Sequence, residues 1–266
     1  MMNLVDSAAK TKIWVISLTK ATERRAAFKA TLEGSSLDWD FYDAHTGVSP
    51  DLTYSEKTST RLNGRPMQRG ELGCYSSHHQ LWKWLIDSQD YDQMLVIEDD
   101  VHMDWNYVRD IKGTDFSKLG IEYLRLFAKM PAAWRFIASP FLDKYRHLVQ
   151  FTGYPLGTQV YMVTKSGARK FAANARNLEA PIDVYMDRTW EHGVLNLAIF
   201  PFPAFERHQA SSIGEERFTQ ISRPLHEKIR GVPPRVCRRL QSLWLQWGFS
   251  GRQARKLKKS LKAIRP

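Results

Sequence analysis

Short apolar runs alternate with segments of helical periodicity along the first part of the chain. Residues 13–18 and 94–97 are almost uninterrupted apolar runs, which predict strands buried on both faces. Residues 20–32 and 70–85 place apolar side chains three or four positions apart, which predicts helices, and residues 39–42 predict another strand. This alternation predicts a doubly wound α/β domain, with a mostly parallel central sheet flanked by helices.

The second half of the chain has a weaker pattern. Further strands are predicted at 123–127, 157–163 and 197–200, and further helices at 165–174 and after 180–183. Residues 48–68 are polar and contain two prolines, so we expect a loop there. Residues 128–150 show no clear period.

Three consecutive carboxylates, Glu98, Asp99 and Asp100, follow the apolar run at 94–97. Like charges repel, and a buried carboxylate is costly unless something compensates its charge. A divalent cation such as Mg²⁺ or Mn²⁺ is the usual compensation. Along an extended chain Glu98 and Asp100 point the same way, so both can face one ion. The pattern indicates a metal site, and a solvated acidic turn is the alternative.

The composition is that of a folded soluble protein, with 43% hydrophobic and 25% charged residues. Cys74 and Cys237, the two cysteines, are far apart, which excludes a disulfide framework and a cysteine-rich metal site and suits a reducing cytosol. The run at 13–18 is too short for a secretory signal. No stretch approaches the roughly 20 apolar residues that span a bilayer. We therefore expect a cytoplasmic protein, either soluble or attached to a surface.

The excess positive charge lies at the C-terminal end. The net charge is +11, but residues 223–266 contain thirteen Lys or Arg against the single acid Glu227, which leaves residues 1–222 with −1. We therefore divide the chain into a domain at 1–222 and a basic tail at 223–266.

Apolar residues recur at helical spacing in this tail. They are Val236, Leu240, Leu243, Trp244 and Trp247, then Leu257, Leu261 and Ile264. Basic amphipathic helices with Trp and Leu on their apolar side are typical of membrane-surface segments, so an anionic membrane is the expected partner. Nucleic acid attracts the same charges, but no motif for specific nucleic-acid recognition accompanies them. A solvated tail is the third interpretation.

Several motifs occur in one order along the chain. They are Val15-Ile16-Ser17-Leu18 with Arg24-Arg25, then 43–47 (DAHTG), 69–82 (RGELGCYSSHHQLW), 94–101 (MLVIEDDV), 157–170 (GTQVYMVTKSGARK) and 180–183 (APID). Over about residues 13–213 the chain resembles glycosyltransferase family 25, the lipooligosaccharide and lipopolysaccharide biosynthesis glycosyltransferases. The resemblance implies a GT-A-like fold, a UDP-sugar donor carrying galactose or glucose, a divalent metal (Mn²⁺ or Mg²⁺) and inversion at the anomeric carbon.

The resemblance also implies metal ligands. Asp100 matches the last acid of the family's motif and is the expected direct ligand. Glu98 is expected to support the metal or to contact the ribose through water. A histidine late in the domain often adds a ligand, which suggests His208, although Gln209 and Ser212 match the residues that the family usually shows here.

Donor contacts are implied at two further places. Arg24 or Arg25 is expected to meet the uridine or its phosphates, and Asp99 to orient the nucleotide. Ser77 and His78 are expected on the donor side of a helix. A solvated helix face for the arginines, and a core position for His78, are the alternatives.

An inverting transfer needs a base that accepts the proton of the acceptor hydroxyl. Asp183 matches the family's PID element and is the predicted base, with Asp187 as the reserve. Capping of the helix that starts there is the alternative role of Asp183.

Together these features predict a metal-dependent hexosyltransferase at the inner face of the cytoplasmic membrane. It would act on a lipooligosaccharide or related glycan acceptor. Another metal-dependent enzyme of nucleotide diphosphates is an alternative, although no glycine-rich phosphate loop stands near the N-terminus. A non-catalytic membrane- or nucleic-acid-binding protein on the same fold is the alternative of a different class.

Overall fold

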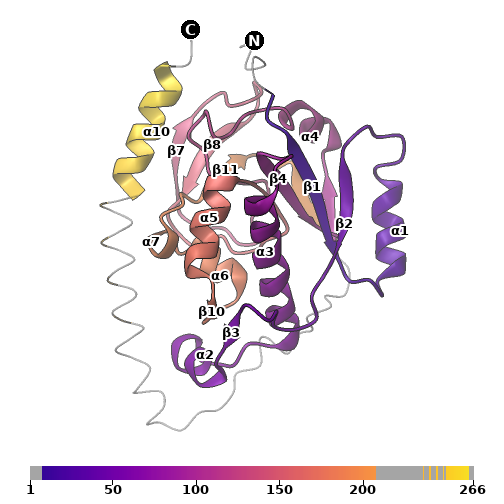
Figure 1. The fold of residues 1–266 in the computed structure, drawn as a ribbon. Coiled ribbons are helices and arrows are strands. Elements are labelled where there is room, and N and C mark those ends of the chain that lie inside the picture. The colour runs from indigo at the N-terminus through magenta and orange to yellow at the C-terminus, as the bar shows by residue number, and fades with distance from the viewer. Residues whose placement is uncertain are drawn as a thin grey trace.

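The computed structural model of the chain describes residues 8–207 and 250–263, together with the single positions 236, 240, 244 and 248. A large sheet lies at its centre (Figure 1). It has eight strands in the order β2-β1-β4-β9-β6-β11-β8-β7. Its strands are β1 (Thr11–Ser17), β2 (Trp39–Asp43), β4 (Gln93–Glu98), β6 (Tyr123–Arg125), β7 (Trp134–Ala138), β8 (His147–Phe151), β9 (Val160–Thr164) and β11 (Leu197–Phe200). Two small sheets pair β3 (Thr53–Tyr54) with β10 (Asn177–Leu178), and β5 (Val101–Met103) with β12 (Ala204–Glu206).

Helices cover both faces of the large sheet. They are α1 (Thr22–Ala30), α3 (Arg69–Asp87), α4 (Trp105–Ile111), α5 (Lys165–Asn174), α6 (Ile182–Asp187) and α10 (Gly251–Ala263). Two further helices are α2 (Glu56–Asn63) and α7 (Thr189–His192), and α7 packs against α5. On β4, Met94 and Val96 pack in one apolar cluster with residues of α3, α5 and α6. Leu95 and Ile97 pack in a second cluster with residues of α1, α4 and α10. Both sides of the strand are therefore buried, which explains its uninterrupted apolar sequence.

The sheet is mixed, so the prediction of a mostly parallel sheet is wrong about the pairing. Strand pairs β1–β2, β1–β4 and β6–β11 are parallel, whereas the other four neighbouring pairs are antiparallel. The difference arises because β9 lies antiparallel between β4 and β6, and β8 lies antiparallel between β11 and β7. All five residues of β9 are buried, and an apolar run buried on both faces does not reveal the direction of its strand.

Most predicted elements are confirmed, including the helices at α3 and α5 and the strands at β1, β2 and β4. The loop predicted at 48–68 is wrong in part, because it contains β3 and α2. Ser55 accepts a hydrogen bond from the backbone N–H of Thr58 at the start of α2, and Gly64 ends the helix in the left-handed region at φ 93°. The stretch at 128–150, which has no clear period, contains β7 and the start of β8.

The described end of the basic tail is an amphipathic helix whose apolar side faces the body of the protein. Ala254, Leu257 and Leu261 of α10 are buried in the same cluster as the sheet residues, and α10 packs against β7. The Lys258 ammonium lies 5.5 Å from the centre of the Phe136 ring. Most of the remaining tail lies outside the described residues, and so does His208 of the preceding domain. Among the described helices, none combines the length and the apolar character that a membrane span requires.

Candidate functional site

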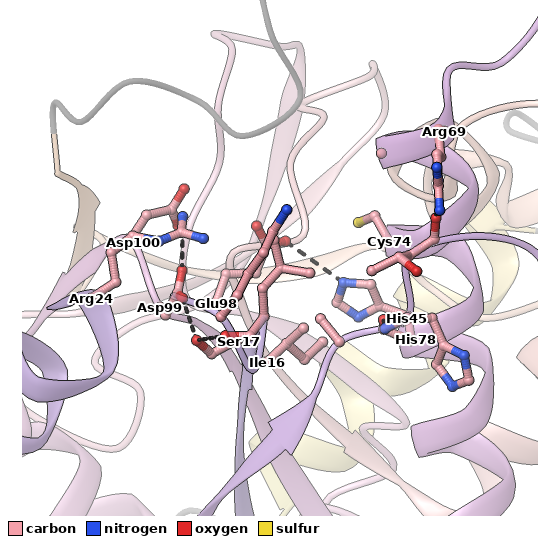
Figure 2. Close-up of a pocket in the computed structure, with 16 residues that line it drawn as sticks. Ile16, Ser17, Arg24, His45, Arg69, Cys74, His78, Glu98, Asp99 and Asp100 are labelled. Carbon is pink, nitrogen blue, oxygen red and sulfur yellow. Dashed lines mark hydrogen bonds and ion pairs between the residues drawn. The ribbon is translucent and has the colours of Figure 1, made fainter. Parts of the chain in front are cut away.

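The ends of β1 and β4 meet at one edge of the sheet and form one wall of a cavity. The two strands are parallel with Ile16 opposite Glu98, so Ser17 lies beside the three acids that follow β4. The cavity has a volume of about 460 Å³, and the start of α3 and the segment after β2 line it as well (Figure 2). Its polar lining residues are Ser17, Lys20, Arg24, His45, Thr46, Arg69, Cys74, Ser77, His78, Glu98, Asp99 and Asp100. Ligands of open α/β sheets bind at such strand ends.

Asp99 faces β1 and α1 and forms an ion pair with Arg24 at the cavity wall. Its Oδ2 accepts a hydrogen bond from the Ser17 hydroxyl at 2.5 Å, and its Oδ1 lies 3.2 Å from Nη1 of Arg24 (Figure 2). The side chain of Asp99 is 6% exposed and that of Arg24 is 22% exposed. Burial raises the pKa of Asp99, although Ser17 and Arg24 oppose that rise. This pair fixes the Arg24 guanidinium at the cavity before any ligand binds.

The Asp100 carboxyl group has a strongly raised pKa. Burial raises its pKa to about 7, and the charges of Glu98, Asp99 and Glu206 add to the rise. Its Oδ1 is buried and has no hydrogen-bond partner among the described residues. A buried carboxylate oxygen without a partner, next to other carboxylates, is a costly arrangement that a cation relieves. The residues present therefore fit a divalent cation at Asp100.

Glu206 reaches this site through a strand pairing that the sequence does not indicate. In the β5–β12 pair Glu206 lies opposite Val101, and the backbone N–H of Arg207 donates to the carbonyl oxygen of Asp100 at 2.7 Å. The Nζ of Lys129 lies 3.2 Å from Oε1 of Glu206. Glu206 and Lys129, which are far from residues 98–100 in sequence, thus add charged groups near this acidic motif.

Glu98 accepts one hydrogen bond and lies close to a histidine ring. The Thr158 hydroxyl donates to its Oε1 at 2.6 Å, and Nε2 of His78 lies 3.6 Å from the same oxygen. Burial alone would raise the pKa of Glu98, but its interactions with His78, Thr158 and Lys129 outweigh burial and lower the pKa. The neighbouring acids Glu98 and Asp100 thus have pKa values shifted in opposite directions.

A buried ion pair holds the loop that carries Thr158. Nη2 of Arg125 lies 2.6 Å from Oδ1 of Asp187, and their side chains are 1% and 0% exposed. Arg125 also donates to the carbonyl oxygens of Leu156 and Gly157, and Oδ2 of Asp187 accepts from the backbone N–H of Leu156. Leu156 and Gly157 are in the left-handed region, at φ 53° and 79°. The Arg125–Asp187 pair therefore stabilises a turn in which Leu156 has a positive φ, a backbone conformation that is unfavourable for leucine.

Asp183 lies beside the loop that the Arg125–Asp187 pair stabilises. Its Oδ2 accepts from the backbone N–H of Gly157 at 3.3 Å, and its Oδ1 accepts from the N–H of Val184. Burial raises the pKa of the Cys74 thiol, and the charges of Glu98, Asp183 and Asp100 add to the rise. Asp183 is not among the residues that line the cavity, and its hydrogen bond to Gly157 places it next to the loop that carries Thr158.

The structure separates the predicted site residues into two groups. Arg24, Ser77, His78, Glu98, Asp99 and Asp100 line the cavity. Arg25 does not line the cavity. Its Nη2 lies 2.5 Å from Oδ1 of Asp43 and donates to the carbonyl oxygen of Ser17 at 2.8 Å, and its guanidinium lies 4.9 Å from the centre of the Phe41 ring. Asp187 is enclosed in the core with Arg125, which argues against its use as the reserve base.

Ser77 and His78 have structural partners as well as cavity positions. The Ser77 hydroxyl donates to the carbonyl oxygen of Gly73 and accepts from the backbone N–H of His45. Ser77 therefore ties α3 to the segment after β2. His78 is fully buried, as expected for a core histidine, yet its ring edge reaches the cavity.

The comparisons with known proteins give one consistent family. The family model described as glycosyltransferase family 25 (LPS biosynthesis protein) matches residues 10–186. Procollagen galactosyltransferase 2 of Homo sapiens is 24% identical over 199 residues, which are 68% of this chain and 30% of that protein. A glycosyltransferase 25 family member of Anopheles gambiae is 24% identical over 192 residues, 68% of this chain and 32% of that protein. The chain thus spans about a third of the length of these relatives.

A solved structure also aligns with part of the chain. It is a glycosyltransferase involved in the glycosylation of the major capsid of PBCV-1, and it covers 60% of this chain at 13% identity with a TM-score of 0.30. A TM-score at that level does not establish a common fold.

Proposed function

The chain belongs to glycosyltransferase family 25, and on this premise we propose that it transfers a hexose from a UDP-sugar to a glycan acceptor with inversion. The observation that carries the proposal is the buried, unpartnered Oδ1 of Asp100 in a cavity whose wall also holds the Arg24 guanidinium. A cation site next to a fixed guanidinium suits a diphosphate. The cavity volume of about 460 Å³ is within the usual range for small-molecule sites.

Asp100 and Glu98 would hold the divalent cation, Mn²⁺ or Mg²⁺, because both present carboxylate oxygens and lie two residues apart after β4. When bound, such an ion neutralises the charge that develops on the departing diphosphate. His208 stays a prediction for a further ligand.

Arg24 would bind the phosphates or the uridine of the donor. Its ion pair with Asp99, and the hydrogen bond from Ser17 to Asp99, hold the guanidinium in one place. Such preorganisation lowers the conformational entropy that donor binding would otherwise cost. Lys20 and Arg69, on other parts of the wall, supply further positive charge.

Asp183 would act as the base that accepts the proton of the acceptor hydroxyl. It is partly exposed, it lies at the N-terminal end of α6, and its Oδ2 has only a long hydrogen bond of 3.3 Å from Gly157. An acid in this position can exchange its weak partner for an acceptor hydroxyl. Asp187, one helical turn later, is already fully engaged with Arg125.

The choice of substrates rests on the family and its named members. The family description names LPS biosynthesis, which supports a lipopolysaccharide, lipooligosaccharide or related glycolipid acceptor. Relatives named procollagen galactosyltransferases support UDP-galactose as the first donor to test, with UDP-glucose as the second.

The acceptor chemistry also motivates a peripheral position on an anionic membrane at its cytoplasmic face. The tail positions Val236, Leu240 and Trp244, four residues apart, are 49%, 61% and 78% exposed. The basic residues of α10 are mostly exposed, while its leucines are buried. Apolar insertion would therefore come from the segment around 236–244, and α10 would add electrostatic attraction. Replacing Leu240 and Trp244 by Ser should release the protein from anionic vesicles in a sedimentation assay. Unchanged sedimentation would contradict this placement.

The transfer proposal is tested with a panel of UDP-sugars and truncated glycolipid acceptors, with products identified by mass spectrometry. We expect a hexose-extended acceptor with UDP-galactose or UDP-glucose. Asp183→Asn should lose this product while it retains UDP binding, because the base does not hold the nucleotide. Asp110→Asn, an exposed carboxylate on α4, is the matched control and should behave as the wild type. Failure to form product with every donor would contradict the proposal, as would full activity of Asp183→Asn.

A further inference from the structure

A second group of metal-binding side chains faces the cavity from the side opposite Asp100. Cys74 and His78 are four residues apart on α3, so their side chains project from the same face of that helix. Glu98 approaches them from the end of β4. The Cys74 Sγ, a ring nitrogen of His78 and a carboxylate oxygen of Glu98 all lie within 4.8 Å of one another (Figure 2).

The spacing of these atoms suits a tetrahedral ion. Zinc binds Cys sulfur at about 2.3 Å, His nitrogen at about 2.0–2.1 Å and carboxylate oxygen at about 2.0–2.2 Å, so ligand atoms around it lie roughly 3.3–3.7 Å apart. Nε2 of His78 and Oε1 of Glu98 are separated by 3.6 Å. That separation is too long for a hydrogen bond and is close to the distance across a metal ion.

His78 supplies independent evidence, because its Nε2 is a buried atom without a hydrogen-bond partner among the described residues. The ring is 0% exposed, and its Nδ1 lies 2.8 Å from the Tyr161 hydroxyl, which also accepts from Nε1 of Trp82 at 3.1 Å. Histidine ligands of metals usually hydrogen-bond through their second nitrogen to a fixed partner. Tyr161 therefore anchors the ring so that Nε2 faces Glu98 and Cys74.

We propose that Cys74, His78 and Glu98 form a binding site for a borderline divalent cation such as Zn²⁺, adjacent to the oxygen site at Asp100 and sharing Glu98 with it. A thiolate and an imidazole favour Zn²⁺ or Co²⁺, whereas Mg²⁺ prefers oxygen ligands alone. All three residues line the cavity, so the fourth coordination position faces its interior. On binding, the Cys74 thiol forms a bond to the metal through sulfur and releases its proton to solvent.

Occupation of this site has a consequence for the cavity. An ion bound there engages Glu98 and lies among residues that line the proposed donor site. Zn²⁺ should therefore compete with donor binding. The cation site is tested by metal binding alone, without a transfer assay. A negative result for this site is therefore distinguishable from a negative result for the proposed transferase activity.

The test uses Co²⁺ as a spectroscopic probe on the full chain without added metal. We expect one Co²⁺ per chain with a near-ultraviolet thiolate-to-cobalt charge-transfer band and the strong visible bands of tetrahedral cobalt. One equivalent of Zn²⁺ should displace it, and excess Mg²⁺ should not. Cys74→Ser should abolish the charge-transfer band and His78→Gln should weaken Co²⁺ binding at least tenfold. Cys237→Ser, the change at the other cysteine, is the matched control and should keep the band.

A second measurement needs no variant and so does not depend on how well the variants fold. Stoichiometric Zn²⁺ should slow alkylation of Cys74 in the wild-type chain, as followed by peptide mass spectrometry, whereas Mg²⁺ should leave the rate unchanged. Absence of the charge-transfer band in the wild type would overturn the proposal. So would a band that survives Cys74→Ser, or alkylation of Cys74 that Zn²⁺ does not slow.

Discussion

Replacing Asp187 by Asn should cost about 3–5 kcal/mol of unfolding free energy, because it leaves Arg125 as a buried cation without its anion. Oδ1 of Asp187 accepts from Arg125 at 2.6 Å and from Asn196 at 2.8 Å, while Oδ2 accepts from the backbone N–H of Leu156 at 2.9 Å. The asparagine has one acceptor oxygen, so its NH₂ group must face one of these donors.

The lower part of that range is expected, because Arg125 keeps other partners. Its guanidinium donates to two backbone carbonyls at 2.9 and 2.6 Å and to Oδ1 of Asn196 at 2.9 Å. These neutral acceptors partly solvate the cation. The matched control is Glu122→Gln, which breaks an ion pair of the same 2.6 Å separation, to Lys170, at the surface. Exposed pairs contribute about 0–1 kcal/mol, so this variant should remain close to the wild type.

The double variant Arg125→Met with Asp187→Leu distinguishes the effect of the ion pair on protein stability from its effect on the position of Thr158. Replacing both members of a buried pair by apolar residues is often close to neutral, so we expect it to regain most of the lost stability. Transfer activity should stay low, because the backbone groups of Leu156 and Gly157 still lack the partners that fix Thr158 against Glu98.

Urea unfolding followed by tryptophan fluorescence measures the stability of these variants, with kcat and KM measured on the same samples. A loss below about 1 kcal/mol for Asp187→Asn would refute the assignment of a buried, uncompensated charge. Full activity in the double variant would refute the positioning role.

Two further perturbations follow from the packing. An added Cβ at Gly73 would lie 2.2 Å from the carbonyl oxygen of His45, whereas Gly47 has nothing within 4 Å. Gly73→Ala should therefore cost about 1–3 kcal/mol and weaken donor binding, measured by urea unfolding and calorimetry, and equal effects from the control Gly47→Ala would contradict this. Burial lowers the pKa of His192 to about 3, so only the unfolded chain gains its proton as the pH falls below about 6.5. Stability should then fall by about 1.4 kcal/mol between roughly pH 7.5 and 5.5 through this residue. His192→Asn should show a correspondingly smaller loss over that range, and an identical pH slope would count against the account.

The sequence reveals buried elements better than edge elements, for physical reasons. The strand at 93–98 and the helix at 165–174 are predicted closely, because burial on one or two faces produces a clear period. In contrast, β7 is an edge strand with a register shift between Phe136 and Ala138, and its first three residues are not buried. An irregular edge strand has little alternation to detect.

The residues of the candidate site also differ in how readily the sequence reveals them. The acids after β4 can be found because three charges follow an apolar run. Lys129 and Glu206 cannot be found so easily, because only the pairing of β5 with β12 brings Glu206 beside Asp100. Arg24 and Arg25 are neighbours in sequence, but successive residues of a helix point about 100° apart, and only the fold decides which one faces the cavity.

The central claim is that Asp100 holds a divalent cation that supports binding and reaction of a UDP-sugar. The most direct measurement is Mn²⁺-dependent release of UDP from UDP-galactose and UDP-glucose, combined with calorimetry of UDP binding in the presence and absence of Mn²⁺. We expect the wild type to require the metal in both assays, and Asp100→Asn to lose metal-dependent UDP binding and UDP release while it unfolds at a similar urea concentration. Metal-dependent UDP binding and release that are unchanged in Asp100→Asn would contradict the account.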